Sequence, residues 1–290
     1  MLVQILLNAI RGFLIGVAEV IPGVSGGTVA LVVGIYERLL AQAAQVSKAI
    51  ATTFSKPLEA LRQLGRLDFR FLLPLGAGMV AAILSAAAVL EPLFVTSPEI
   101  LFALFAGLIA ASLVVPYKMV SRWQVRHVAA GAIAAIAAFI LTSLPQGNAA
   151  DPAGWVIFLA ATVAVCALVL PGVSGSFFLL AIGMYQPTIA AVNDRDLAYL
   201  GIFALGALVG LLSFAVFMQF LLERFRDMTL AVMTGLMLGS LRALWPWQTE
   251  SRQLLAPNDP LFPALAFCVG VLIVSGLIVW QRRLNQASAQ

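Results

Sequence analysis

Charged residues are scarce in this chain. Asp, Glu, Lys and Arg together make up 10% of its 290 residues, whereas soluble domains carry roughly 25%. Hydrophobic residues make up 62%, the mean hydropathy is +1.01, and apolar segments of about 20 residues recur along the whole length. This composition predicts a polytopic membrane protein in which 1–290 form a single membrane domain. We expect the apolar N-terminus to be retained, because an internal repeat begins within it.

Histidine and cysteine are also rare, which limits the available chemistry. His127 is the single histidine, and Cys166 and Cys268 lie in apolar segments, so no disulfide, metal site or other cofactor is predicted. No Gly-rich Walker motif with a lysine occurs, so ATP is not the expected direct energy source. The net charge is +4, but the basic residues are not clustered on a polar domain, which argues against nucleic-acid binding.

One short sequence occurs twice. Pro-Gly-Val-Ser-Gly at 22–26 returns at 171–175, and Gly-x-Tyr at 34–36 returns at 183–185, both at an offset of 149 residues. Five later residues return at an offset of 128: Asp68, Gly78, Gly107, Ser112 and Leu113 match Asp196, Gly206, Gly235, Ser240 and Leu241. The smaller offset means that a charged linker at 41–67 is much shorter in the second copy. The chain is therefore predicted to contain two tandem units, 1–145 and 153–282.

The distribution of basic residues predicts the orientation in the membrane. Thirteen of the 17 Lys and Arg residues fall in segments assigned to the cytoplasm, whereas the loops at 91–98 and 146–152 contain none. This pattern places both termini on the cytoplasmic side of the cytoplasmic (inner) membrane and inverts the second unit relative to the first.

The predicted fold class is an all-α polytopic membrane protein with two inverted-topology repeats. Each repeat is a helix pair broken at Pro-Gly-Val-Ser-Gly and followed by three transmembrane helices. An arm of ~18 residues is ~27 Å long as a helix. Each pair can therefore be a re-entrant hairpin or two tilted spans.

The repeated motif has the features of an anion site. Proline ends the preceding helix, glycine allows close backbone approach, and serine or threonine is typical at the start of the next helix. Free amides at a helix N-terminus bind phosphate or carboxylate, and we expect such donors at Ser25, Gly26 and Gly27. In an inverted pair, the two termini approach near the membrane midplane and can be offered to each face in turn. The candidate residues are Gly23, Ser25, Gly26, Gly27 and Thr28, with Gly172, Ser174, Gly175 and Ser176.

Three charged residues in or at the end of apolar segments are further candidates. Glu19 is either a proton carrier or a carboxylate that stays protonated or bonds the adjacent turn. Arg11 lies two helical turns earlier on roughly the same face and could pair with Glu19 or with the anion. Arg242 ends a span, where it either reaches a phosphate or extends to the lipid headgroups.

Two other interpretations of the motif compete with an anion site. Paired Pro-Gly kinks could serve only to pack helices closely, as small residues do in membranes. Gly-x-Ser-x-Gly at 23–27 also matches the nucleophile elbow of hydrolases. We reject the hydrolase because no strand precedes the motif, Ser176 replaces the last glycine in the second copy, and His127 falls in a predicted cytoplasmic loop.

The first motif resembles the opening signature of a bacterial and archaeal membrane family assigned as polyprenyl-phosphate transporters. The matching residues are Glu19-Val-Ile-Pro-Gly-Val-Ser-Gly-Gly-Thr28 and Gly34-Ile-Tyr36-Glu37, and 170–176 and 239–246 resemble later family motifs. Members return undecaprenyl phosphate, the lipid carrier of cell-wall sugars, to the cytoplasmic leaflet. The resemblance implies that the serine, glycine and threonine residues of both motifs handle the phosphate head and that Arg242 assists.

The leading hypothesis is a flippase for a polyprenyl phosphate that exposes its two motifs alternately. The alternatives are a transporter or channel for a small soluble anion, and an integral-membrane lipid phosphatase. The phosphatase lacks an intramembrane histidine and has one carboxylate well inside an apolar segment, so an enzyme is not predicted. Coupling to protons through Glu19 and movement down a gradient are both open. Base rates for symmetric assemblies favour a homodimer.

Overall fold

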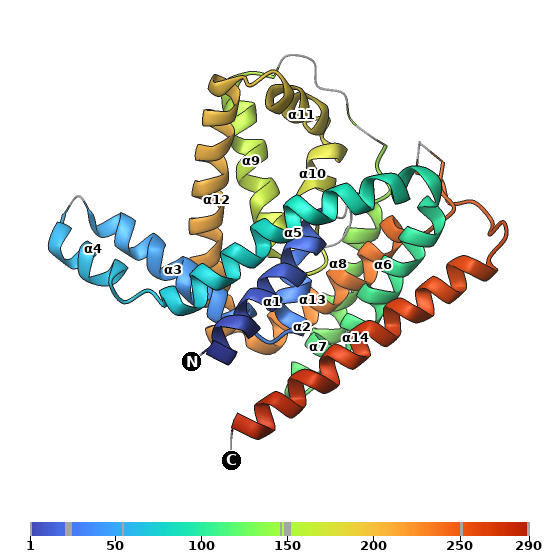
Figure 1. Ribbon diagram of the computed structural model, residues 1–290, viewed down its shortest axis with the longest axis horizontal. Helices are drawn as coiled ribbons and strands as arrows, with labels where there is room; N and C mark the ends of the chain where they lie inside the picture. The colour runs from blue at the N-terminus through green and yellow to red at the C-terminus, as the bar shows by residue number, and fades with distance from the viewer. Residues whose placement is uncertain are drawn as a thin grey trace.

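The protein is built of helices. A computed structural model describes residues 2–20, 25–53, 55–145, 147, 152–249 and 252–288, and in this part of the chain the one strand-like contact is a bridge between Gln248 and Leu254. The first half contains α1 (Leu2–Val20), α2 (Gly26–Val32), α3 (Tyr36–Thr53), α4 (Pro57–Leu64), α5 (Phe69–Thr96), α6 (Pro98–Ser112), α7 (Val114–Met119) and α8 (Val125–Leu141) (Figure 1). The second half contains α9 (Gly154–Val169), α10 (Gly175–Ala181), α11 (Tyr185–Asn193), α12 (Leu197–Arg224), α13 (Arg226–Ser240), the 3-10 turn η1 (Leu241–Leu244) and α14 (Leu261–Ser288).

Several of these helices can cross a membrane. Among the described residues, four segments are long and apolar enough, namely α1, α6 continued by α7, α12 and α14. The number rises to six if each of two bent pairs is one span: α4 with the start of α5, bent by 68°, and α10 with α11, bent by 109°. Two shorter apolar helices, α8 and α9, accompany them. The predicted all-helical membrane protein is confirmed.

The segment after each repeated motif is short. Both α2 and α10 have seven residues, or about 10 Å of helix, so neither crosses a hydrocarbon core of about 30 Å. Each ends at a turn containing a glycine with positive φ, Gly34 at 72° and Gly183 at 78°, which other residues adopt with strain. The apolar arm that the sequence predicts after each motif is thus interrupted a second time.

The stretch at 41–67 is not the linker that its charge predicts. Most of it is helical and forms the greater part of α3 together with α4, with α3 packed against α12. Buried residues at helical spacing on α3, such as Leu40 and Ala44, explain this packing. The amide of Gln45 donates to the carbonyl oxygen of Gln63 at 2.8 Å and joins the two helices. Figure 1 shows α3 and α4 extending to one side of the molecule.

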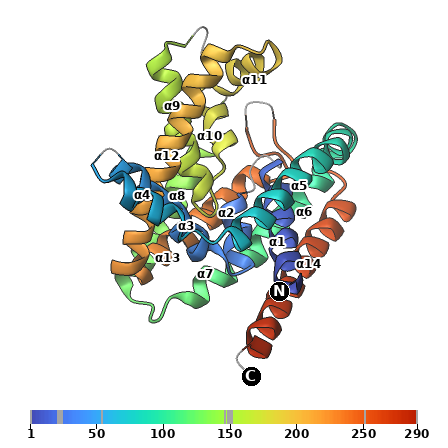
Figure 2. The ribbon, with the colours of Figure 1, turned by 60° about the vertical axis from the view of Figure 1, so that its left-hand side comes forward.

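Four helix pairs form the framework: α1 with α5, α9 with α12, α6 with α14, and α8 with α13. Figures 1 and 2 both show α9 and α12 side by side. In the order of the two halves, α9 and α12 correspond to α1 and α5. The remaining pairs are crossed, because α14 from the second half packs on α6 and α8 from the first half packs on α13.

Glycines allow close approach in each framework pair. At four glycines, one in each pair, an added Cβ would overlap a carbonyl oxygen of the facing helix. The overlaps are Gly78 with Ala9, Gly206 with Phe158, Gly107 with Phe267, and Gly235 with Gly131. These are the glycines that match at an offset of 128 residues. The spacing found in the sequence therefore corresponds to equivalent helix contacts in the two halves.

Candidate functional site

The two repeated motifs meet where α9 ends. The hydroxyl of Ser25 lies within hydrogen-bonding distance of the carbonyl oxygens of Leu168, at 3.2 Å, and Leu170, at 3.1 Å. The hydroxyl oxygen of Thr28 accepts from the amide of Gly172 at 2.9 Å. Ser25 and Thr28 are both 1% exposed, so the contact between the motifs is buried.

A tyrosine from the repeated Gly-x-Tyr sequence completes this contact. The Tyr36 hydroxyl donates to the carbonyl oxygen of Val169 at 3.2 Å. Three side chains of the first half thus lie within hydrogen-bonding distance of four backbone groups, at residues 168, 169, 170 and 172, where α9 ends and the second motif begins. Backbone polar groups at membrane depth must be satisfied by protein or by a wet cavity, and here the first half satisfies them.

The hydroxyls of the second motif have different partners. The Ser174 oxygen caps α10 by accepting from the amide of Phe177 at 3.4 Å, and it lies 2.9 Å from the Ser176 hydroxyl. Ser25 occupies the corresponding position before α2 but makes no capping hydrogen bond, because its hydroxyl bonds the end of α9 instead. Gly175 lies close to the carbonyl oxygen of Ala164, where a Cβ would overlap it. Where both copies are described, a serine precedes a seven-residue helix in each, and the copies differ in what their hydroxyls bond.

Glu19 corrects the expectation of free amides in the first motif. Its carboxylate oxygen Oε1 accepts from the Gly26 amide at 3.0 Å, so that donor is occupied by the chain's own anion. A Cβ on Gly26 would overlap this carboxylate, and a Cβ on Gly27 would lie 2.6 Å from the Val169 carbonyl oxygen. Of the predicted site residues, Gly23 falls outside the described residues.

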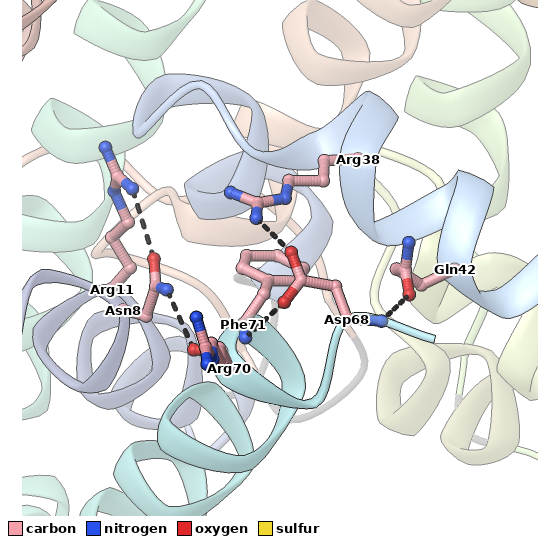
Figure 3. Close-up of polar contacts among 7 residues, drawn as sticks. All are labelled: Asn8, Arg11, Arg38, Gln42, Asp68, Arg70 and Phe71. Carbon is pink, nitrogen blue, oxygen red and sulfur yellow. Dashed lines mark hydrogen bonds and ion pairs between the residues drawn. The ribbon is translucent and has the colours of Figure 1, made fainter. Parts of the chain in front are cut away.

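Arg11 lies on the same helix as Glu19 but does not pair with it. The Arg11 guanidinium donates to the side-chain oxygen of Asn8 at 3.3 Å, as Figure 3 shows. It also donates to the side-chain oxygen of Gln281 at 3.2 Å. Both partners are neutral amides, and Arg11 is 7% exposed. Gln281 belongs to the last helix, which no sequence motif links to Arg11.

Arg242 and Arg252 lie near the second motif. Arg242 donates to the carbonyl oxygens of Thr142 at 2.7 Å and Arg252 at 2.8 Å, so it joins the end of α8 to the loop before α14. The guanidinium of Arg252 stacks 4.1 Å from the ring centroid of Phe177 in the first turn of α10. Burial, and after it the charge of Arg242, lower the pKa of Arg252.

Sequence reasoning overlooked Arg252 and Tyr36 as site residues and misplaced His127. Arg252 has no sequence signal, because its loop lies outside the repeated motifs. The repetition of Tyr36 as Tyr185 is a signal that could have identified it. His127, expected in a loop, lies in the first turn of α8, with its Nδ1 3.0 Å from the carbonyl oxygen of Arg122.

Three cavities adjoin the motifs. The first has about 1270 Å³ of space, including its open mouth, and is lined by α2, α3, α7 and the end of α14, through Leu31, Tyr36, Arg38, Lys118, Gln281 and Arg282 among others. The second, of about 550 Å³, is mostly apolar and includes Gly172, Ser174, Thr142 and Ser240. The third, of about 1190 Å³, includes Ser176, Leu180, Tyr185, Glu99 and Arg252.

The first and third cavities are lined by matching residues. Leu31 and Tyr36 in the first correspond to Leu180 and Tyr185 in the third at the offset of 149 residues. Figure 1 has α7 and the C-terminal end of α14 at the bottom and α11 at the top, so these cavities lie toward opposite ends of the molecule. A protein with one such cavity toward each end can bind an anion with an apolar body at either of its two ends.

Comparisons with known proteins give the same family throughout. A family described as undecaprenyl phosphate translocase-like matches residues 15–259. A polyprenyl-phosphate transporter of Vibrio cholerae serotype O1 is 37% identical over 247 residues, which are 82% of this chain and 77% of the relative. A polyprenyl-phosphate transporter of Staphylococcus aureus is 30% identical over 260 residues, 83% of this chain and 86% of the relative. No solved structure matches. The names of both relatives agree with the prediction that the chain is not an enzyme.

Proposed function

This chain belongs to the undecaprenyl phosphate translocase-like family, and from that premise we propose that it moves a polyprenyl phosphate, undecaprenyl phosphate in particular, across the cytoplasmic membrane. The observation that carries the proposal is the contact of the two motifs, in which Ser25 and Thr28 bond the backbone at 168–172. Helix breaks that face each other inside a membrane bundle are where transporters bind their substrates.

The two halves act as inverted repeats in this proposal. The equivalent glycine contacts, the crossed helix pairs and the matched linings of the first and third cavities support it. In this proposal the buried motif contact is the barrier between the two cavities. Transport then consists of opening one cavity toward the motifs while the other closes.

The phosphate head binds at the helix starts of both motifs. Ser174 and Ser176 are positioned for this role, since their hydroxyls lie 2.9 Å apart and each lines one of the cavities near α10. Ser25 and Thr28 become available when the motifs separate, because their hydroxyls then lose the backbone of the other half. Arg242 and Arg252 supply positive charge beside the second motif.

Glu19 couples binding to proton uptake. Its carboxylate holds the Gly26 amide, which is one of the donors that a phosphate needs. Two anions cannot share that donor in a low-dielectric setting, so a proton on Glu19 favours its replacement by phosphate. Glu19 would then release its proton on the other side of the membrane when the lipid is released there.

In this proposal the lipid phosphate moves toward the cytoplasmic face. The basic ends near α7, the α12–α13 turn and α14 support a cytoplasmic position for the first cavity and for both termini. Return of the lipid phosphate to this face recycles the carrier for cell-wall synthesis.

A binding measurement on the purified full-length protein tests the site. Undecaprenyl phosphate is titrated in nanodiscs by native mass spectrometry, in competition with undecaprenol and with inorganic phosphate. Ser174→Ala combined with Ser176→Ala should weaken lipid binding about tenfold or more, since hydrogen bonds to a charged group are the strong ones. Ser213→Ala is the matched control, because the Ser213 hydroxyl bonds a carbonyl of its own helix.

Three outcomes contradict parts of the proposal. Equal binding by the double variant and the control removes the second motif from the site. Displacement of the lipid by inorganic phosphate at similar concentration favours a small-anion transporter, which the same donors would serve. Release of inorganic phosphate from the lipid would indicate a phosphatase.

A further inference from the structure

The first cavity has a basic lining that the repeated motifs do not explain. Lys118 from α7 and Arg282 from α14 bring positive charge from two different helices, and the third basic residue of the lining, Arg38 from α3, forms an ion pair with Asp68. The one acidic residue in the lining, Glu37, has its carboxylate 2.8 Å from Arg226, so its charge is already compensated. The lining therefore carries excess positive charge.

A buried cation lies directly behind this lining. Arg11 contacts the cavity residue Gln281, and within the described residues it makes no ion pair. Its Nε is buried and has no hydrogen-bond partner in the described structure. Burying a charge is costly unless an opposite charge accompanies it. An anion in the first cavity would supply the missing charge.

Arg38, in the same region, is an arginine whose charge is compensated by a carboxylate. Its guanidinium forms an ion pair with Asp68 and stacks 4.2 Å from the ring centroid of Phe71. In Figure 3 both Arg11 and Arg38 extend above the start of α5, and the carboxylate of Asp68 meets Arg38. The Arg11 guanidinium instead donates to the neutral side chain of Asn8. The two arginines therefore differ in having a counter-charge, and Arg11 is the one that lacks it.

The rest of the lining suits a hydrocarbon chain. Leu31, Val115 and Ile278 give the cavity an apolar wall between α7 and α14. Elsewhere on α14, Leu272 and Val279 are exposed apolar side chains. A ligand with an anionic head and a long apolar tail can thus place its head at the basic side and its tail along α14.

We propose that the first cavity is a second headgroup site, in which Lys118 and Arg282 bind the phosphate of a polyprenyl phosphate and Arg11 provides the buried counter-charge behind Gln281. This site rests on the proposed function and is separate from the repeated motifs. The lipid phosphate occupies this site at the end of the molecule where α7 and the C-terminus lie, either before or after it binds the motifs.

The test removes the two accessible charges and compares a charge-matched control. Lys118→Ala combined with Arg282→Ala is set against Arg122→Ala combined with Arg283→Ala, which removes the same charge from neighbouring exposed positions outside the cavity. Undecaprenyl phosphate and inorganic phosphate are each titrated into full-length protein in nanodiscs made of neutral lipid. The first variant should bind the lipid phosphate about tenfold or more weaker, and the control within about twofold of wild type.

A third variant tests the buried charge. Arg11→Gln keeps a polar side chain beside Gln281 and removes the cation, and it should weaken lipid binding without changing the binding of undecaprenol. If this variant does not fold, the pair of exposed variants still decides the question. Equal affinities for the cavity variant and its control would overturn the inference, and so would a site that binds inorganic phosphate as tightly as the lipid.

Failure of this inference is distinguishable from failure of the proposed function. If wild type does not bind or transport polyprenyl phosphate, the function itself is wrong. If wild type binds it, the Ser174 and Ser176 variant weakens it, and the cavity variant behaves as its control, the function stands and the second headgroup site is refuted.

Discussion

Replacing Thr28 with valine tests whether the hydrogen bond between the two motifs stabilises the protein. Valine has the shape of threonine but cannot accept the hydrogen bond from the Gly172 amide, which would be left buried without a partner. A neutral hydrogen bond contributes about 0.5–1.5 kcal/mol, and an unsatisfied buried donor costs about 1–3 kcal/mol. Interhelical bonds in membrane proteins lie toward the lower end, averaging about 0.6 kcal/mol. We therefore expect Thr28→Val to lower the free energy of unfolding by about 1–2 kcal/mol.

The measurement is reversible unfolding in mixed detergent and SDS micelles, with Thr142→Val as the control. Thr142 is also buried, but its hydroxyl donates to the carbonyl of Ala138 in the last turn of the helix that it directly follows, so its loss should cost less than about 0.5 kcal/mol. Equal stabilities of the two variants would refute the idea that the side chains of the first half satisfy the break at the end of α9. A loss confined to Thr28→Val would support it.

Two further predictions concern helix contacts and surface charge. Gly206→Ala should lower the free energy of unfolding by about 1–3 kcal/mol because its Cβ meets the Phe158 carbonyl, whereas Gly201→Ala, with open space around it, should raise stability by up to about 1 kcal/mol; similar stabilities would contradict this. The hydrogen bond from Arg38 holds the pKa of Asp68 below its usual value, so wild type should exceed Asp68→Asn in stability at neutral pH. That advantage should vanish as the pH falls through the lowered pKa, which unfolding curves at several pH values would reveal.

The sequence predicted the framework better than the site. The matched glycines, such as Gly78 and Gly206, supported the prediction of two units, and the structure places them at equivalent helix contacts, where close backbone approach tolerates no side chain. The position of Ser174 before α10 also follows from local rules, since capping depends on residues three positions apart.

The partners of the site residues could not be predicted in the same way. Ser25 bonds Leu168 and Leu170, more than 140 residues away, instead of capping its own helix. Arg11 lies on roughly the same helix face as Glu19, yet it bonds Gln281 in the last helix. Such choices depend on which helices pack together, and neither repeat spacing nor hydrophobic periodicity contains that information.

The crossed pairs α6 with α14 and α8 with α13 have a consequence for how such a chain could arise. Each half completes the helix packing of the other. If the halves are inverted repeats, as proposed above, two copies of a single half inserted in opposite orientations would make the same contacts between separate chains. A gene encoding one half would then yield an antiparallel dimer, and duplication with fusion would join its members. Expressing 1–145 and 153–290 as separate polypeptides in one cell would test whether the two halves assemble without a covalent link.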